Sequence, residues 1–283
     1  MRARLVTQPF RLAVVTAMLL TPGVLAGSAS DQARAPELVQ FDIAWAKPNP
    51  HQLRGYLRRP PAAGRYPAVV LLHDCVGDWR GIDERWGKLL ASWGYAALTV
   101  DSYGSRGIAG ACNNEQIAPD LFDAYSALMF LRGSPFVVAD RIAVMGVSAG
   151  GTRTLWSVER GFIERQFREK FRAAIALYPQ CFSVTGRITV PTLILIGERD
   201  EWTRAADCRE LVRRTGGGDD GAAEDGMRPP LRLVVYPGAH HAFDNPAYRT
   251  GRRFLWHWLE YDKAVADRAV EEVRAFLRET LGG

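Results

Sequence analysis

The stretch RIAVMGVSAGG at residues 141–151 decides the fold class. Its first residues are mostly apolar, as in a strand buried on both faces, and the segment 151–161 has apolar side chains at helical spacing. Between them, GVSAG at 146–150 has the G-x-S-x-G spacing of a tight strand-to-helix turn that exposes a serine hydroxyl. We therefore predict a strand, a turn carrying Ser148 and a helix, as in a layered α/β domain.

The flanking sequence extends this pattern in both directions. Two extended pieces at 41–48 and 53–60 predict an opening antiparallel hairpin. Beyond them, apolar runs alternate with segments of helical spacing, which predicts a mostly parallel central sheet flanked by helices on both faces. The predicted strands are 68–74, 95–101, 141–146, 171–179, 192–197 and 231–237, and the predicted helices are 84–94, 120–133, 151–161, 205–214 and 264–281.

One segment, GGGDDGAAEDGMRPP at 216–230, interrupts the alternation with glycine and aspartate. Because the βα pattern resumes after it, we interpret this segment as a flexible surface excursion rather than a domain boundary. A lid over the site is the alternative interpretation. The residues 30–283 are then expected to form a single domain.

The first 29 residues have the layout of a secretory signal peptide. Three arginines precede the apolar run 12–26, and small residues follow it. The run is shorter than the ~20 apolar residues that cross a bilayer. We therefore predict cleavage after Ala26 or Ala29, a secreted or periplasmic location, and no stable membrane insertion of the mature chain.

Charge and cysteine spacing bear on the partner classes. The net charge is +5, and three of these charges belong to the leader arginines, which leaves 5 − 3 = +2 for the rest of the chain. Since the chain has no long basic run, nucleic acid is not an expected partner. The four cysteines lack CxxC or CxxH spacing, so disulfides in an exported protein are favoured over a zinc site, with buried free thiols as the alternative.

Two later predicted strands end in loops that carry an acid and a base, Asp200 and His241. The order serine, acid, histidine at the carboxyl ends of parallel strands is typical of sites in which a histidine activates a serine nucleophile. Other interpretations are that Ser148 and Asp200 only cap helices, or that Glu198 is the acid. Spacing alone does not choose between His241 and its neighbour His240.

These motifs resemble those of the dienelactone hydrolase family within the α/β-hydrolases. The resemblance rests on GVSAGG, GERDEWT and YPGAHHAFD, with HDCVG after the first parallel strand, and runs from about Phe41 to the end of the chain. It implies an α/β-hydrolase fold and acyl chemistry. In that family the histidine stands just before Ala-Phe, which selects His241, and the acid falls on Asp200.

The resemblance also implies an oxyanion hole made by the backbone N–H groups of Ala149 and Cys75. The best-known members of the family have cysteine where this chain has Ser148, and an acidic residue, matched here by Asp74, helps to manage the thiol. With serine as the nucleophile, shaping the loop is the remaining expectation for Asp74.

Those enzymes also hold a substrate carboxylate with two arginines. Arg106 matches one of them, but Asp244 and Asn245 stand where the other is expected, so a dienelactone substrate is not supported. Four aromatic residues in or near the loops at this face are candidates for lining the pocket, with plain packing as the alternative. They are Tyr103, Trp156, Trp202 and Phe243.

The order of strands in this fold predicts how the four cysteines pair. Cys75 and Cys112 follow two neighbouring strands, and Cys181 and Cys208 follow two others at the same rim of the sheet. We therefore predict the disulfides Cys75–Cys112 and Cys181–Cys208.

The predicted activity is two-step hydrolysis of a small ester or lactone by Ser148, His241 and Asp200, with no cofactor and no metal. An exported peptidase or a polyester depolymerase would use the same three side chains. A non-catalytic binding protein on a hydrolase scaffold is an alternative of a different class.

Overall fold

The computed structural model describes residues 35–44, 52–112, 122–215 and 231–282. The predicted leader at 1–29 and the predicted excursion at 216–230 lie outside these residues. The described residues all belong to one compact unit of the chain.

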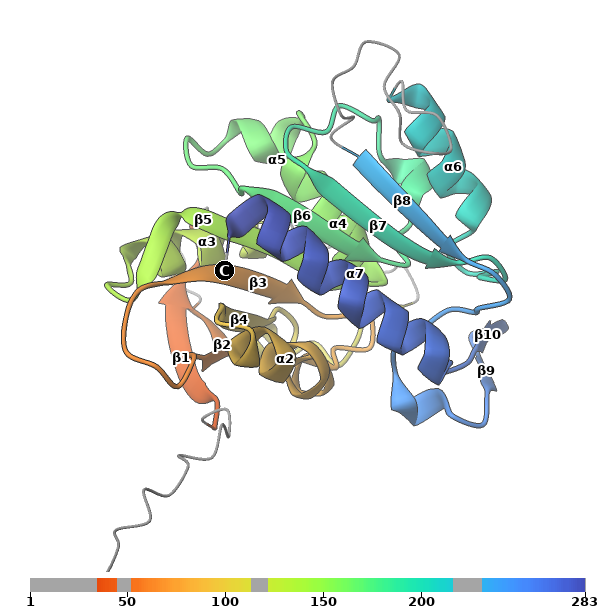
Figure 1. Cartoon of the computed structure of the whole chain (residues 1–283), viewed down its shortest axis with the longest axis horizontal. Coiled ribbons are helices and arrows are strands. Elements are labelled where there is room, and N and C mark those ends of the chain that lie inside the picture. The colour runs from red at the N-terminus through yellow and green to blue at the C-terminus, as the bar shows by residue number, and fades with distance from the viewer. Residues whose placement is uncertain (1–34, 45–51, 113–121, 216–230, 283) are drawn as a thin grey trace, which may run out of the picture. The chain divides into compact units, whose positions relative to one another are not determined.

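An eight-stranded sheet organises these residues, with the strand order β1-β2-β4-β3-β5-β6-β7-β8. The first two pairings, β1 with β2 and β2 with β4, are antiparallel, and all later pairings are parallel. The predicted opening hairpin and mostly parallel sheet are therefore confirmed, although the first strand lies at Glu37–Asp42, earlier than the predicted 41–48 (Figure 1). The strands are β1 (Glu37–Asp42), β2 (Gln52–Arg58), β3 (Tyr66–Leu72), β4 (Ala96–Asp101), β5 (Val137–Val147), β6 (Ala173–Leu177), β7 (Thr192–Gly197) and β8 (Leu231–Tyr236).

Helices follow most of the parallel strands. The predicted single helix 84–94 is instead three consecutive pieces that begin earlier, because the side chain of Asp78 accepts a hydrogen bond from Gly81 N at 2.9 Å and starts α1. The longer helices are α3 (Asp123–Gly133), α4 (Ala149–Val158), α6 (Ala205–Arg214) and α7 (Lys263–Leu281). The shorter ones are α1 (Trp79–Ile82), η1 (Asp83–Gly87), α2 (Lys88–Ser92), η2 (Gly104–Arg106), α5 (Phe162–Arg165), η3 (Cys181–Ser183) and η4 (Pro246–Tyr248).

The alternation of side chains along β3 builds a core on each face of the sheet. Val69 and Leu71 pack in one cluster with Leu90 of α2 and with residues of α7, which crosses the sheet in Figure 1. Val70 and Leu72 belong to a second cluster that contains apolar residues of α3. Because every residue from Ala68 to Leu72 is buried, β3 is covered on both faces, as its apolar sequence predicts.

A small hairpin, β9 (Arg252–Phe254) and β10 (His257–Leu259), was not predicted from the sequence. It follows β8 and pairs outside the main sheet. An isolated bridge joins His241 to Leu259 of β10, and Glu260 N donates to His241 O at 3.1 Å. The hairpin therefore supports the loop that carries His241.

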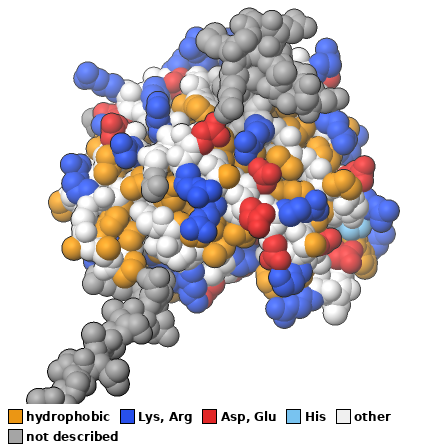
Figure 2. All heavy atoms as spheres, in the orientation of Figure 1, with side chains coloured by type: hydrophobic (Ala, Val, Ile, Leu, Met, Phe, Trp, Pro, Cys, Tyr) orange, Lys and Arg blue, Asp and Glu red, His pale blue; other side chains and the backbone are white. Residues whose placement is uncertain are grey.

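The surface shows no gathering of one charge on the face drawn in Figure 2, where basic and acidic side chains are interspersed. Within the described part of the chain, every helix is too short or too polar to cross a bilayer.

Candidate active site

Ser148 occupies the sharp turn between β5 and α4, with φ 53° and ψ −119°. A Cβ on Gly146 would lie 2.3 Å from the carbonyl carbon of Gly150, and a Cβ on Gly150 would lie 2.2 Å from Leu72 O. Only glycine fits at these two positions, because strand and helix approach so closely. The Ser148 side chain makes no capping hydrogen bond to α4, so its hydroxyl is free to face the opposite loops.

The structure brings Ser148, His241 and Asp200 together, as the order of motifs predicts. His241 Nε2 lies 3.0 Å from Ser148 Oγ, and His241 Nδ1 lies 2.7 Å from Asp200 Oδ2. All three residues are buried. With Asp200 ionised, the ring proton sits on Nδ1, and Nε2 accepts the hydroxyl proton of Ser148.

The two oxygens of Asp200 have different partners. Oδ1 accepts backbone hydrogen bonds from Trp202 N at 3.0 Å and Thr203 N at 2.8 Å, while Oδ2 faces His241. Burial alone would raise the pKa of Asp200, but the neighbouring His241 and the hydrogen bonds from Thr203 outweigh it and hold this pKa below its usual value. Asp200 is therefore the ionised partner that fixes the ring of His241.

Thr203 and Tyr178 also hold this arrangement, and neither was singled out in the sequence. Thr203 Oγ1 lies 2.9 Å from Asp200 Oδ2 and 3.0 Å from Tyr178 O. The Tyr178 ring packs edge-on against His241 at 4.7 Å, and its hydroxyl donates to Asp244 Oδ1 at 2.5 Å. The only sequence signal was the placement of Thr203 three residues after Asp200, a spacing typical of Asp side chains that accept backbone bonds.

The alternative acid and base point elsewhere. Glu198 is exposed, and its Oε2 accepts a hydrogen bond from Gly238 N at 3.0 Å. His240 Nε2 lies 3.8 Å from Glu260 Oε2, and its ring packs edge-on against Trp258. Neither residue contacts Ser148 or Asp200, so the geometry favours Asp200 and His241.

The two proposed oxyanion donors flank Ser148. Ala149 is the first residue of α4, so its N–H has no partner one turn earlier within the helix. Cys75 follows β3 and lines the same pocket as Ser148 and His241. The sequence prediction that both belong to the site therefore fits their positions.

The structure contains the disulfides Cys75–Cys112 and Cys181–Cys208, the same pairs as predicted, and no free cysteine among the described residues. The first pair lies at the pocket, since Cys75 lines it. The second pair is buried, with both cysteines in the core cluster that contains α7.

Asp74 lines the pocket, and its Oδ1 accepts hydrogen bonds from Val76 N at 3.2 Å and Asp78 N at 3.3 Å. Burial raises its pKa, against these backbone hydrogen bonds. Asp74 thus shapes the loop that follows β3, and it places a carboxyl group at the pocket.

The neighbouring His73 is also buried, and its two ring nitrogens are both engaged. Nδ1 donates to Asp74 O at 2.7 Å, and Nε2 accepts from Ser102 N at 3.2 Å. Burial lowers the pKa of His73 to about 4. His73 is therefore a neutral residue that ties two loops together, and its ring nitrogens are not available to the pocket.

Of the five candidate substrate-binding residues, only Trp202 lines the pocket, where its ring packs 5.0 Å from that of His241. Arg106 pairs with Asp123 through contacts of 2.7 and 2.8 Å and donates to Ser102 O at 2.6 Å. Its guanidinium is thus used to hold its own loop. Binding of a substrate carboxylate by Arg106 is a prediction that this geometry does not favour.

The other three aromatic candidates pack into the protein: Tyr103 and Phe243 are buried, and Trp156, which lies on α4, is half-buried. Phe243 is fully buried against Tyr178 and Tyr236. Tyr103 is buried, and its hydroxyl accepts from Arg153. The indole of Trp156 faces Ser183 O at 3.4 Å and packs against the core. Packing was the alternative left open for these residues, and they do not line the pocket.

Part of the pocket wall comes from the unpredicted β9–β10 hairpin. Phe254 and Leu259 of this hairpin line the pocket together with Trp202. Trp202 in turn stacks on His257 at 4.9 Å. Residues 252–259 show no alternation of apolar and polar side chains that would predict the hairpin. The hairpin is anchored by Glu201, whose Oε1 accepts a hydrogen bond from Trp258 N at 2.9 Å.

The family model described as "Dienelactone hydrolase family" matches residues 53–281. A curated Bradyrhizobium protein named a probable 2-oxo-3-(5-oxofuran-2-ylidene)propanoate lactonase is 26% identical over an alignment of 228 residues that covers 74% of this chain and 86% of that protein.

Two solved structures are similar in fold. One is a dienelactone hydrolase-like promiscuous phosphotriesterase from metagenomic libraries, with a TM-score of 0.66 and 19% identity over 88% of this chain and all of that chain. The other is esterase 2 of Thermogutta terrifontis phosphorylated by paraoxon, with a TM-score of 0.62 and 20% identity over 86% of this chain and 94% of that chain. At these identities the likeness shows the fold alone.

Proposed function

The chain belongs to the dienelactone hydrolase family, and we propose that it is a serine hydrolase that cleaves a small ester or lactone through an acyl-enzyme intermediate. The observation that carries the proposal is the pair of hydrogen-bond contacts that His241 makes, 3.0 Å to Ser148 Oγ and 2.7 Å to Asp200 Oδ2. A serine hydroxyl is a poor nucleophile unless a base of this kind removes its proton.

In the first step, Ser148 Oγ attacks the carbonyl carbon of the substrate while His241 Nε2 takes the hydroxyl proton. The negative charge on the former carbonyl oxygen is stabilised by the N–H groups of Ala149 and Cys75. The imidazolium of His241, held by Asp200, then gives its proton to the leaving oxygen, which departs and leaves an ester between the acyl group and Ser148.

In the second step, a water molecule replaces the leaving group. His241 takes a proton from the water, whose oxygen attacks the acyl-enzyme carbonyl, and returns it to Ser148 Oγ as the acid is released. These two reaction steps use side chains and backbone groups of the chain and require no cofactor or metal.

The name of the Bradyrhizobium relative, a probable lactonase, supports a lactone ring as one substrate class, although the substrate in that name also carries a carboxylate. Hydrolysis of a lactone follows the same steps, with the leaving oxygen still tethered to the acyl group. The described lining of the pocket contains Asp74 and Asn245 but no Lys or Arg, which favours substrates without a carboxylate.

Labelling by a fluorophosphonate, followed by mass spectrometry of the peptide containing Ser148, tests the nucleophile directly. We expect one adduct on Ser148 and none in Ser148→Ala. A protein that stays unlabelled would be a binding protein on a hydrolase scaffold. A panel of p-nitrophenyl esters, lactones and peptides then separates an esterase from a peptidase or a polyester depolymerase, and we expect esters and lactones to be cleaved.

The two disulfides support activity in an oxidising compartment, since such bonds persist outside the reducing cytosol. We propose a secreted or periplasmic location on this basis.

A further inference from the structure

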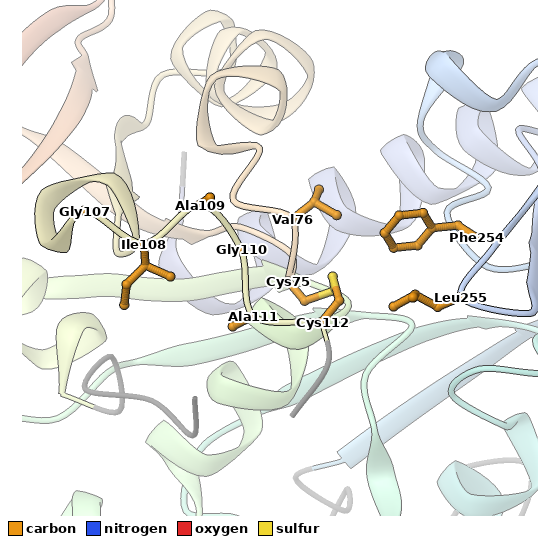
Figure 3. Close-up of a pocket in the computed structure, with 10 residues that line it drawn as sticks. All are labelled: Cys75, Val76, Gly107, Ile108, Ala109, Gly110, Ala111, Cys112, Phe254 and Leu255. Carbon is orange, nitrogen blue, oxygen red and sulfur yellow. A yellow bond between two sulfur atoms is a disulfide. The ribbon is translucent and has the colours of Figure 1, made fainter. Parts of the chain in front are cut away.

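A larger cavity opens beside the pocket that contains Ser148, and we call it the side cleft. Its volume is about 610 Å³, which falls in the range of small-molecule sites. Figure 3 shows the loop 107–112 along one side, Phe254 and Leu255 of the β9–β10 hairpin on the other, and the Cys75–Cys112 disulfide between them. Cys75, Val76 and Phe254 line both the side cleft and the Ser148 pocket, so the two cavities adjoin each other.

The described residues that line the side cleft carry no charge. Their side chains are alkyl groups, one phenyl ring and the disulfide, and backbone peptide groups supply the polar atoms. Arg106, which directly precedes this loop, has its guanidinium on Asp123. Asp74 in the adjoining pocket supplies no positive charge to hold a carboxylate. The chemistry of the cleft therefore matches an uncharged group that contacts apolar side chains and backbone peptide groups.

The positions of the reacting groups indicate which half of an ester enters the side cleft. The leaving oxygen must lie near His241, because Nε2 of this residue donates the proton that releases it. The acyl group then extends away from His241. The side cleft is lined by Cys75, the proposed oxyanion donor, and by neither Ser148 nor His241, which favours the acyl group over the leaving group as its occupant.

The turn of the hairpin places apolar side chains where the backbone does not favour them. Leu255 has φ 45° and Trp256 has φ 72°, in the left-handed region that favours Gly, Asn or Asp. Both are exposed, with 38% of Leu255 and 89% of Trp256 accessible, yet only Leu255 lines the cleft. A bulky apolar residue with positive φ raises the free energy of the folded backbone. Such strain is expected at sites where the side chain contacts a ligand.

We propose that the side cleft binds the acyl group of the substrate, and that this group is an uncharged, mainly aliphatic chain longer than acetyl. The inference rests on the proposed serine hydrolase function. It assigns Leu255 and Ile108, from the two sides of the cleft, as determinants of chain-length specificity.

The first measurement is kcat/KM for p-nitrophenyl acetate, butyrate, hexanoate and octanoate. Because burial of a methylene stabilises a complex by about 0.8 kcal/mol at most, we expect kcat/KM to rise by about two- to fourfold per methylene. Mono-p-nitrophenyl glutarate is compared with p-nitrophenyl valerate, whose acyl chain has the same carbon number without the carboxylate. We expect the anionic ester to be the poorer substrate by about tenfold or more.

The decisive comparison is Leu255→Asp against Trp256→Asp. Both substitutions put the same charge on the same turn, and aspartate tolerates positive φ better than leucine or tryptophan does. We expect Leu255→Asp to lower the octanoate-to-acetate ratio of kcat/KM by about tenfold, and Trp256→Asp to change it by less than about twofold. Ile108→Asp, on the other side of the cleft, is expected to act like Leu255→Asp and serves if the hairpin variant does not fold.

Two results would overturn the inference while leaving the serine mechanism intact. One is an equal kcat/KM for the acetate and octanoate esters, and the other is an equal effect of Leu255→Asp and Trp256→Asp on the octanoate-to-acetate ratio. Failure of the mechanism has a different signature, since Ser148 would then stay unlabelled by the fluorophosphonate. An unlabelled Ser148 would mean that no acyl-enzyme forms, and it would therefore contradict the acyl cleft together with the mechanism.

Discussion

Thr203 Oγ1 lies 2.9 Å from Asp200 Oδ2, the same carboxylate oxygen that faces His241. It also lies 3.0 Å from Tyr178 O and 3.2 Å from His241 Nδ1. A hydroxyl has one proton and two acceptor sites, so Thr203 donates to one oxygen at a time. Donation to Asp200 Oδ2 holds the carboxylate that faces His241, whereas donation to Tyr178 O joins the loop after β7 to the end of β6. Both contacts make Thr203 a positioning residue for Asp200 and His241.

Thr203→Val is therefore expected to lower kcat by about ten- to a hundredfold with little change in KM, because a hydrogen bond to a charged group is worth about 1.5–3 kcal/mol. Valine keeps the shape of threonine and removes only the hydroxyl. Thr203→Ser keeps the hydroxyl and should retain most of the activity. Steady-state kinetics on a p-nitrophenyl ester measure both variants, and an inactive Thr203→Ser would point to packing instead.

Ser148→Ala is expected to fold normally and to lose turnover by several orders of magnitude, because the residual rate comes only from binding and the oxyanion donors. His241→Ala should act similarly, and Asp200→Asn somewhat more mildly. Ester hydrolysis is the readout, and circular dichroism is the control for folding. Near-native activity in Ser148→Ala would rule out the proposed nucleophile.

The adjacent histidines give a matched pair of variants. His240→Ala should keep most of the activity, because His240 faces Glu260 and Trp258, whereas His241→Ala should not. Both proteins are compared at the same pH on the same ester. The reverse result would assign the base to His240.

The sequence was sufficient for those parts of the fold and site that depend on local pattern. The elbow at Ser148 follows from its glycines, and the ends of two apolar strands place an acid and a histidine opposite it. The choice of Asp200 over Glu198 and of His241 over His240 came from the family resemblance. The β9–β10 hairpin was missed because its strands are three residues long and its turn, Leu255 and Trp256, lacks the Asn-Gly residues typical of such turns.

The direction in which side chains point was the other feature that the sequence did not predict. Tyr103, Trp156 and Phe243 lie near the expected loops, yet they turn into the protein, since proximity in sequence does not fix which way a side chain points. Thr203 was missed for a related reason. Its contact with Asp200 is local, but its contact with Tyr178, 25 residues earlier, exists only after β6 and β7 have paired.

His73 is expected to make stability fall in mild acid. Its pKa in the folded protein is about 4 against 6.5 for the free side chain, so between these values the unfolded chain binds a proton that the folded protein does not. Folding stability is then fully present above pH 6.5 and falls by about 3 kcal/mol as pH drops to 4.

Urea unfolding of the wild type and His73→Gln at pH 7 and pH 4 checks this expectation. Glutamine can still accept the hydrogen bond of Ser102 N, and it does not titrate. The other acid-sensitive groups, such as Asp200, contribute equally to both proteins, so the difference in pH dependence isolates His73. An equal loss of stability in the two proteins would contradict the assignment.

The two disulfides join cysteines that lie 37 and 27 residues apart in sequence. Loop-closure entropy gives each bond about 3–4 kcal/mol of stability. Cys75–Cys112 borders the open side cleft, whereas Cys181–Cys208 lies in the core, so a mild reductant should open the first bond before the second. Because Cys75 is a proposed oxyanion donor, activity should fall while the circular dichroism spectrum is unchanged.

Two double variants serve as controls. Cys181→Ala/Cys208→Ala should still lose activity early in the reduction, whereas Cys75→Ala/Cys112→Ala should start with low activity and lose no more of it at that stage. Peptide mapping under non-reducing conditions verifies the pairs, and four free thiols would refute the prediction.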